Sequence, residues 1–144
     1  MELVIKEFKE LSSQELYTLL QVRISVFVVE QTCPYQELDG KDQSALHLYY
    51  RRDEKILAYL RLLQKSPEEV AIGRVLTIER GSGLGKSLMQ EAIKLAKTRL
   101  SAKGIYIEAQ TYAKGFYEQL GFVRCSDEFL EDGIPHIKMQ LTLQ

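Results

Sequence analysis

Residue types that define several classes of protein are scarce in this sequence of 144 residues. It has only two cysteines, Cys33 and Cys125, and two histidines, His47 and His136. So few isolated ligands argue against a disulfide scaffold and a metal site, and free thiols in a reducing, cytoplasmic setting are expected. No apolar run approaches the roughly 18 residues of a membrane-spanning helix. The first ten residues alternate apolar and charged side chains, which is not typical of a signal peptide.

An excess of positive charge is also missing. Nineteen lysines and arginines face 20 aspartates and glutamates, for a net charge of -1. Because the neutralisation of phosphates drives nucleic-acid binding, nucleic acid is not an expected partner. A membrane is not expected either, because no apolar run is long enough to span one. Hydrophobic residues make up 45% and charged residues 27% of the chain, as in ordinary globular domains. No internal repeat or Pro/Gly-rich linker divides the sequence, so residues 1–144 are predicted to form a single domain.

The N-terminal third predicts a strand, a helix and a loop. Residues 2–8 alternate apolar and charged side chains, as a half-buried strand does. Ser12 and Glu15 have the spacing of a capping box, so a helix is predicted to begin there. Apolar residues at helical spacing continue to about Glu30. Residues 31–44 lack periodicity and are predicted to be a loop.

The remainder alternates strands and helices. The longest helix signal follows a glycine-rich turn and runs from Leu84 to Leu100, with Gly104 as its C-terminal stop. A short helix is predicted at 112–120. Strands are predicted at 45–51, 55–64, 70–78, 105–110, 122–126 and 135–142. The fold class is therefore α/β, with a mixed, mostly antiparallel sheet, one parallel βαβ crossover over residues 70–110, and helices on both faces.

Glycines between a predicted strand and the longest predicted helix form the most informative motif. Residues 80–87 read Arg-Gly-Ser-Gly-Leu-Gly-Lys-Ser. Such a turn presents unpaired backbone N–H groups at the positive end of a helix, an arrangement that binds phosphate oxygens. A dinucleotide fingerprint requires glycine at position 86, where the chain has lysine, and a P-loop requires glycine at position 80, where it has arginine. The pattern that remains is Gln/Arg-x-x-Gly-x-Gly/Ala, satisfied by Arg80, Gly83 and Gly85, and the alternative is a tight turn whose glycines serve geometry alone.

This motif, in this position, resembles that of the GNAT N-acetyltransferase superfamily, in which it binds the pyrophosphate of acetyl-coenzyme A (acetyl-CoA). The resemblance implies that the preceding strand pairs its backbone with the pantetheine arm and offers an N–H group to the thioester oxygen. Gln110 binds CoA or, alternatively, caps the following helix, and Arg74 and Lys86 either face phosphates or pair with neighbouring acids. The residues implied to bind acetyl-CoA are Val75, Leu76, Thr77, Arg80, Gly81, Ser82, Gly83, Leu84, Gly85, Lys86 and Gln110.

A second segment carries the resemblance further. Residues 110–122, which read Gln-Thr-Tyr-Ala-Lys-Gly-Phe-Tyr-Glu-Gln-Leu-Gly-Phe, are similar to the family segment that follows the parallel strand. A tyrosine of that segment commonly gives a proton to the departing CoA thiolate, and Tyr117 occupies its position. A phenol can supply such a proton. The alternative is that Tyr117, like Phe116 and Phe122, is a core aromatic residue.

Four further stretches are similar to the ElaA-like branch of the superfamily. They are residues 26–31, 33–42, 72–75 and 131–136. With the two motifs above, the resemblance extends from about Leu19 to Met139, and its long N-terminal part is the most specific.

The resemblance implies an enzyme that transfers an acetyl group from acetyl-CoA directly to a primary amine, without a covalent acyl-enzyme. The acceptor is a small molecule or a peptide, no metal takes part, and the fold is compatible with a homodimer. The amine must lose a proton before it attacks, and Glu108, on the strand that leads to Gln110, is the candidate base. The alternatives for the base are Glu30, Glu37, Asp39, Asp42, His47 and His136.

Two questions about function stay open in the sequence. The acids within residues 37–42 favour a cationic acceptor, such as a polyamine, a lysine or a protein N-terminus, unless they only line a solvated surface loop. A non-catalytic CoA- or acyl-CoA-binding regulatory module would keep the same cofactor motif. A nucleotide-binding domain would require one of the two motifs that fail.

Overall fold

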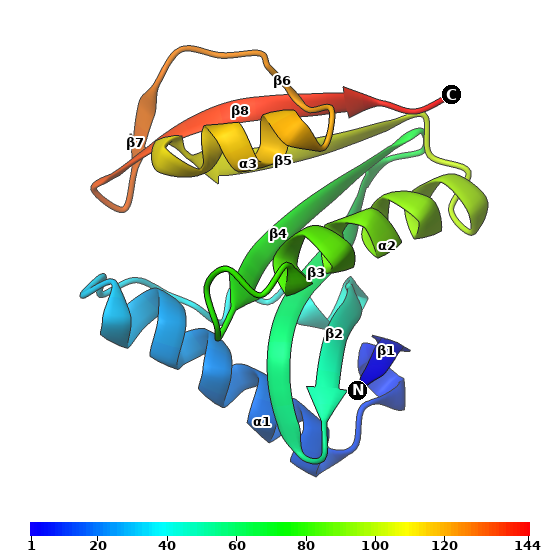
Figure 1. Cartoon of the computed structure of the whole chain (residues 1–144), viewed down its shortest axis with the longest axis vertical. Coiled ribbons are helices and arrows are strands. Elements are labelled where there is room, and N and C mark those ends of the chain that lie inside the picture. The colour runs from blue at the N-terminus through cyan, green and yellow to red at the C-terminus, as the bar shows by residue number, and fades with distance from the viewer.

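An eight-stranded sheet organises the computed structural model, which describes all residues from Met1 to Gln144. The strands are β1 (Glu2–Glu7), β2 (Leu46–Arg52), β3 (Lys55–Ser66), β4 (Glu69–Thr77), β5 (Gly104–Gln110), β6 (Val123–Arg124), β7 (Phe129–Glu131) and β8 (Ile134–Thr142). Their order across the sheet is β1-β2-β3-β4-β5-β8-β6, and β7 also pairs with β8 (Figure 1). Every pair is antiparallel except β4 and β5. The predicted mixed sheet with one parallel crossover is confirmed.

Helices cover both faces of the sheet, as predicted (Figure 1). They are α1 (Ser13–Ile24), α2 (Leu84–Thr98) and α3 (Lys114–Gln119), with short helical turns η1 (Phe8–Glu10), η2 (Ser25–Glu30), η3 (Asp42–Ser44) and η4 (Thr111–Ala113). Neighbouring residues of β2 serve opposite faces, because Tyr49 packs in the cluster of Leu19 from α1 and Leu48 packs in the cluster of Leu88 from α2. None of the helices combines the length and the apolar character that crossing a bilayer requires.

The start of α1 confirms the predicted capping box. The backbone N–H of Glu15 donates to Ser12 Oγ at 3.0 Å, and the N–H of Ser12 donates to Glu15 Oε1 at 2.9 Å. The helix continues to Glu30, as predicted, but its last six residues form the π-helical turn η2. Two reciprocal bonds thus fix where α1 begins and how the chain leaves β1.

The end of α2 contradicts the sequence prediction. Gly104 is not the helix stop, since it is the first residue of β5 and the helix ends at Thr98. The residue in the left-handed conformation is Ser101, with a φ of +51°. The turn closes when the N–H of Ala102 donates to the carbonyl of Ala96 at 3.0 Å. A serine therefore takes the role that glycine has at many helix ends.

The C-terminal hairpin was not predicted in full. The strand expected at 122–126 shortens to two residues, and β7 is an additional strand that pairs with the start of β8. Asp132 and Gly133 connect β7 to β8, and both have positive φ, +51° and +76°. An Asp-Gly pair favours this kind of two-residue hairpin turn. The turn brings Glu131 back beside the first residues of β8.

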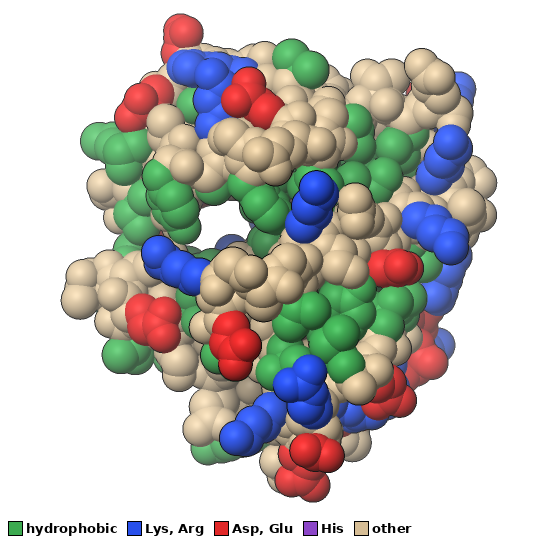
Figure 2. Space-filling view, in the orientation of Figure 1, with side chains coloured by type: hydrophobic (Ala, Val, Ile, Leu, Met, Phe, Trp, Pro, Cys, Tyr) green, Lys and Arg blue, Asp and Glu red, His purple; other side chains and the backbone are tan.

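The strands β4 and β5 are neighbours over only part of their length. Their parallel ladder joins residues 69–71 to residues 104–106, and beyond Ala71 the two strands diverge (Figure 1). A cavity of about 1000 Å³ lies in this fork, with walls from β3, β4, β5, α3 and residues 26–41. Figure 2 shows an opening in the surface on the side of residues 26–41. The divergence of the two strands therefore creates a hollow large enough to hold an extended ligand.

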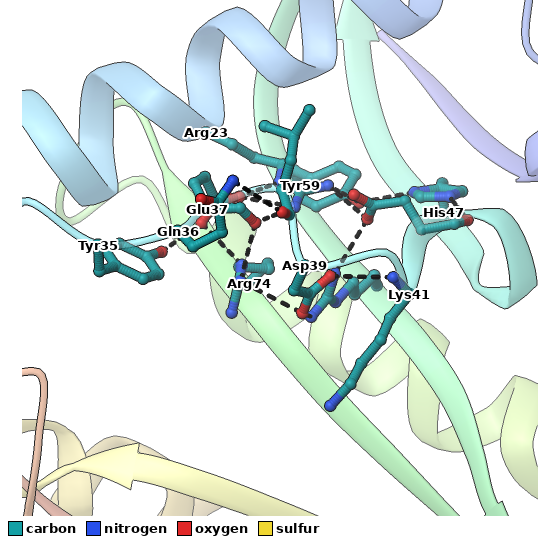
Figure 3. Close-up of polar contacts among 12 residues, drawn as sticks. Arg23, Tyr35, Gln36, Glu37, Asp39, Lys41, His47, Tyr59 and Arg74 are labelled. Atoms are coloured by element: carbon teal, nitrogen blue, oxygen red, sulfur yellow. Dashed lines mark hydrogen bonds and ion pairs between the residues drawn. The ribbon is translucent and has the colours of Figure 1, made fainter.

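Three arginines fix the loop of residues 31–44 as one wall of this cavity (Figure 3). Arg23 of α1, which is fully buried, lies 2.6 Å from Glu37 and 2.7 Å from Asp42. Arg61 of β3 binds Asp39 at 2.5 Å and Asp42 at 3.0 Å. The third arginine is Arg74 of β4, which pairs with Glu37 and Asp39 of the same loop. Burial alone would raise the pKa of Asp42, but the hydrogen bonds and charges of Arg23 and Arg61 hold it below its usual value. We call this set of side chains the ion network.

A buried histidine closes the ion network at its inner end (Figure 3). His47 Nε2 lies 2.9 Å from the carbonyl oxygen of Asp42, and Nδ1 lies 2.6 Å from the hydroxyl of Tyr59. A carbonyl only accepts, so Nε2 carries the proton and Nδ1 accepts from Tyr59. Burial and the charges of the nearby arginines lower the pKa of His47, and the hydrogen bond to Asp42 opposes that change less strongly. His47 is therefore neutral in the folded protein near pH 7.

We predict that His47 makes stability depend on pH below neutrality. Because its pKa is lower in the folded chain than the value of 6.5 in the unfolded chain, the unfolded chain binds more protons as the pH falls below about 6.5. The stabilisation is complete above that pH and is lost below it. The free energy of unfolding, measured with urea between pH 8 and 5, should decrease as the pH falls. The decrease should be steeper in wild type than in His47→Gln, which does not titrate at this position, by up to about 1.4 kcal/mol per pH unit. Parallel curves would contradict this prediction.

Candidate active site

The glycine-rich turn forms the entrance to α2. Gly81 and Gly83 have φ of +76° and +78°, a left-handed conformation that side chains disfavour, and Gly83 is the residue that precedes the helix. The hydroxyl of Ser82 donates to the carbonyl of Glu79 at 2.9 Å and holds the turn closed. The N–H groups of the first helical turn, including that of Lys86, have no acceptor within the helix. This terminus has the geometry and partial charge that suit a phosphate.

The third glycine of the motif serves packing instead. A Cβ atom on Gly85 would lie 2.9 Å from Cγ2 of Thr77 and 3.7 Å from Phe116. The first turn of α2 can therefore rest directly on the end of β4 and beside α3 only if residue 85 has no side chain. The motif combines two glycines that allow positive φ with one that allows close approach.

The structure brings most of the residues implied by the resemblance to one cavity. Beyond Ala71, β4 has no partner on the β5 side, so its free backbone edge lines the fork. Part of the turn does not line the cavity, although Arg80 and Gly85 of the same turn do. The residues that do not line it are Gly81, Ser82, Gly83, Leu84 and Lys86. The residues that line it are Val75, Leu76, Thr77, Arg80, Gly85, Glu108, Gln110 and Tyr117.

Tyr117 lies in α3 between two other aromatic rings. Its ring centroid is 5.0 Å from that of Phe116 and 5.9 Å from that of Phe122, both in edge-to-face arrangements. Phe122 is buried, in agreement with its assignment to the core, whereas Tyr117 both packs on the core and lines the cavity. Burial raises the pKa of Tyr117, so its hydroxyl keeps its proton at neutral pH.

Gln110, at the end of β5, connects two walls of the cavity. Its amide nitrogen donates to Oε1 of Gln31 at 3.2 Å. Gln110 is the N-cap residue of the helical turn η4 that follows, but its side chain makes no capping bond there. Gln110 joins β5 to the start of the loop opposite.

Carboxylates and a histidine gather on the β5 and β8 side of the cavity. Glu108 accepts a hydrogen bond from the hydroxyl of Tyr106 at 2.8 Å. Glu131 lies 3.6 Å from Nε2 of His136, whose Nδ1 donates to a backbone carbonyl. Burial and the proximity of Glu108 raise the pKa of Glu131. Sequence reasoning did not select Glu131, although the Asp132-Gly133 turn could have placed it beside His136.

Several alternatives for the base lie away from the cavity or are occupied. The acids Glu37, Asp39 and Asp42 are bound to arginines of the ion network, so they are not free to attract a cationic acceptor. His47 is buried and bonded on both ring nitrogens. Of the two interpretations of Arg74, the pairing with acids is the one that the structure has. Glu30, Glu108 and His136 line the cavity.

Comparison with known proteins agrees with this geometry. The model of the acetyltransferase (GNAT) domain matches residues 9–143. The chain is 42% identical to a UPF0039 protein of Schizosaccharomyces pombe, over 99% of this chain and 98% of the relative. It is 40% identical to the protein ElaA of Escherichia coli, over 90% of this chain and 89% of ElaA.

Solved structures agree as well. An acyl-CoA N-acyltransferase from Pseudomonas aeruginosa superposes with a TM-score of 0.92 at 43% identity, covering 98% of this chain and 99% of that one. The crystal structure of Escherichia coli ElaA gives the same TM-score at 39% identity, with the same coverage. A family model that spans nearly the whole chain and relatives this similar in sequence and structure show that the protein belongs to the GNAT acetyltransferase family and is ElaA-like.

Proposed function

We propose that the protein transfers an acetyl group from acetyl-CoA to a primary amine of a small molecule or peptide. The observation that carries this proposal is one cavity that the free edge of β4, Gly85 in the first turn of α2 and the side chain of Tyr117 all line. Family membership supports acyl transfer from CoA. Free cysteines at positions 33 and 125 are consistent with a reducing compartment such as the cytoplasm.

Each part of acetyl-CoA has a matching part of the cavity, or of the glycine-rich turn next to it, in this proposal. The N–H groups of residues 81–86 and the guanidinium of Arg80 would hold the pyrophosphate. The backbone of Val75–Thr77 would pair with the amides of the pantetheine arm. The chain has no general excess of positive charge, so these local donors must supply the attraction for a polyanionic cosubstrate.

The chemistry follows as a direct transfer. The neutral amine nitrogen forms a bond to the thioester carbon, a backbone N–H of β4 stabilises the oxygen that becomes negative, and the carbon–sulfur bond then breaks. The departing thiolate takes a proton from the hydroxyl of Tyr117. Glu108 accepts the proton that the amine loses, with Glu131 as the second carboxylate on that wall. The products are an amide and CoA.

We predict that Tyr117→Phe separates binding from catalysis. Phenylalanine keeps the ring that packs against Phe116 and Phe122 but cannot give a proton to the thiolate. Thiol release with an amine found by screening primary amines should slow about 100-fold. The increase in melting temperature caused by acetyl-CoA should stay close to that of wild type.

Other outcomes have defined meanings. A wild-type melting temperature that neither CoA nor acetyl-CoA raises would overturn the proposed function. Turnover by Tyr117→Phe at the wild-type rate would reject Tyr117 as the proton donor. Binding by the wild type without turnover of any amine would favour a regulatory CoA-binding module.

We also predict that Gly85→Ala weakens CoA binding through a steric clash. The new Cβ would lie 2.9 Å from Cγ2 of Thr77, so the first turn of α2 or the side chain of Thr77 must shift. We expect a loss of stability of about 1–3 kcal/mol and about tenfold weaker binding of CoA in calorimetry. The double variant Gly85→Ala/Thr77→Ser lacks that methyl group and should recover both.

The matched control is Gly115→Ala. A Cβ on Gly115 meets no atom within 4 Å, so this substitution should leave CoA binding unchanged and should not lower stability, which we expect to rise by about 0.5–1 kcal/mol because alanine favours a helix more than glycine does. Wild-type affinity in Gly85→Ala, or no recovery in the double variant, would show that close packing at residue 85 does not matter for the site.

A further inference from the structure

One residue of β4 has a backbone conformation that its side chain disfavours. In the ladder with β3, Leu76 pairs with Tyr59, and Gly73 pairs with Arg61. The two residues of β4 between these pairs, Arg74 and Val75, therefore lie opposite a single residue of β3. This is a β-bulge, and Arg74 has a φ of +55°. Glycine is the usual residue at such a left-handed position, because any other residue is strained there.

The neighbouring glycine does not take this conformation. Gly73 precedes Arg74 and is not among the residues with positive φ. The chain therefore places the strained conformation on an arginine, although the residue that would adopt it without strain is one position away. Some interaction of the arginine side chain must hold the backbone in this state.

The side chain of Arg74 makes that interaction with the loop of residues 31–44 (Figure 3). Its Nε lies 2.7 Å from Oε1 of Glu37, and a terminal nitrogen donates to the backbone carbonyl of Glu37 at 3.0 Å. The same nitrogen lies 3.5 Å from Oδ2 of Asp39. The guanidinium also lies over the ring of Tyr35, 5.5 Å from its centroid. Every partner of the Arg74 side chain belongs to the loop.

The loop is anchored independently of β4. Glu37 is bound to Arg23 of α1 at 2.6 Å, and Asp39 is bound to Arg61 of β3 at 2.5 Å. These bonds hold the two carboxylates in place, so Arg74 attaches the bulge to a fixed wall.

The bulge is also where the free edge of β4 faces the cavity. The ladder with β5 ends at Ala71, and the bulge interrupts the ladder with β3 at residues 74 and 75. The N–H groups that the proposed function assigns to the thioester oxygen lie on or directly after this bulge. Their direction depends on the φ of Arg74.

We propose that Arg74 is a positioning residue that aims the backbone N–H groups of the bulge at the acyl carbonyl, by fixing its own left-handed conformation to the loop. The inference rests on the proposed function, since it concerns how that site recognises the thioester. In this proposal the loop of residues 31–44, through Arg74, helps to determine how the backbone of β4 recognises the carbonyl.

The test compares two ligands that differ at the carbonyl. Acetyl-CoA has the thioester oxygen, whereas S-ethyl-CoA has the same size and charge but no carbonyl. Calorimetric affinities for wild type should favour acetyl-CoA by about fivefold, the effect of about one net hydrogen bond. In Arg74→Ala the ratio should fall to near 1, while binding of S-ethyl-CoA changes little.

Three further variants distinguish positioning from a general structural role. Arg74→Gly permits the left-handed φ without the side chain and should retain only part of the preference. Arg74→Lys keeps a cation toward Glu37 and should retain more than Arg74→Ala. Arg51→Ala removes an arginine whose ion pairs with Glu2 and Glu15 lie on another part of the sheet, and it should keep the full preference.

The results distinguish failure of the proposed function from failure of the role proposed for Arg74. Wild type that binds neither ligand would overturn the proposed function and this inference together. Wild type that binds both ligands equally, or an Arg74→Ala variant that keeps the wild-type ratio, would overturn this inference alone. A fall in melting temperature without a change of ratio would show that Arg74 is only a structural residue.

Discussion

The missing ladder between the second half of β4 and β5 is the constraint on which the rest of the structure depends. Backbone N–H and C=O groups inside a protein need partners, and beyond Ala71 the edge of β4 faces a cavity instead of a strand. Water, or an extended ligand with amides of its own, must supply those partners. The N-terminus of α2 follows β4 after a turn of six residues and brings further unpaired N–H groups to the same place. The candidate site is thus lined by backbone groups whose hydrogen bonds the fold leaves unmade.

The wall opposite this edge is built from charges that cancel. Three arginines meet three carboxylates in the ion network, so the loop carries acids without adding net negative charge to the cavity. Charges removed from water are costly unless each finds a well-placed partner, and removing one partner leaves the other exposed to that cost. The network therefore supplies a defined geometry for the loop. In the proposed reaction, the attraction of an amine would fall to other groups, among which Glu108 and Glu131 lie on the β5 and β8 side.

Sequence reasoning reaches the features that depend on residues close together in the chain. The capping box, the alternating strands and the glycine turn all involve such residues, and the structure has each of them. The acids of the loop look the same in sequence whether they face water or a distant arginine, so pairing of Arg74 with acids was one of two interpretations and the pairing with Arg23 and Arg61 could not be foreseen. The three residues of β7 are too few to show alternation, and Ser101 has no property that marks it as the left-handed residue in place of Gly104. Likewise, only the bulge reveals that Arg74, and not Gly73, has positive φ.

The short ladder between β4 and β5 also has a mechanical consequence. Three residue pairs join the arm that contains β1–β4 to the arm that contains β5–β8. A sheet resists bending through the hydrogen bonds that cross it, so at this junction much of the connection between the arms comes from the shared core instead, in which Val70, Leu88 and Ile105 belong to one cluster. A molecule bound in the fork would contact both arms beyond the end of the ladder, where the sheet makes no bonds of its own between them. Binding of such a molecule would therefore also stabilise the folded chain against unfolding.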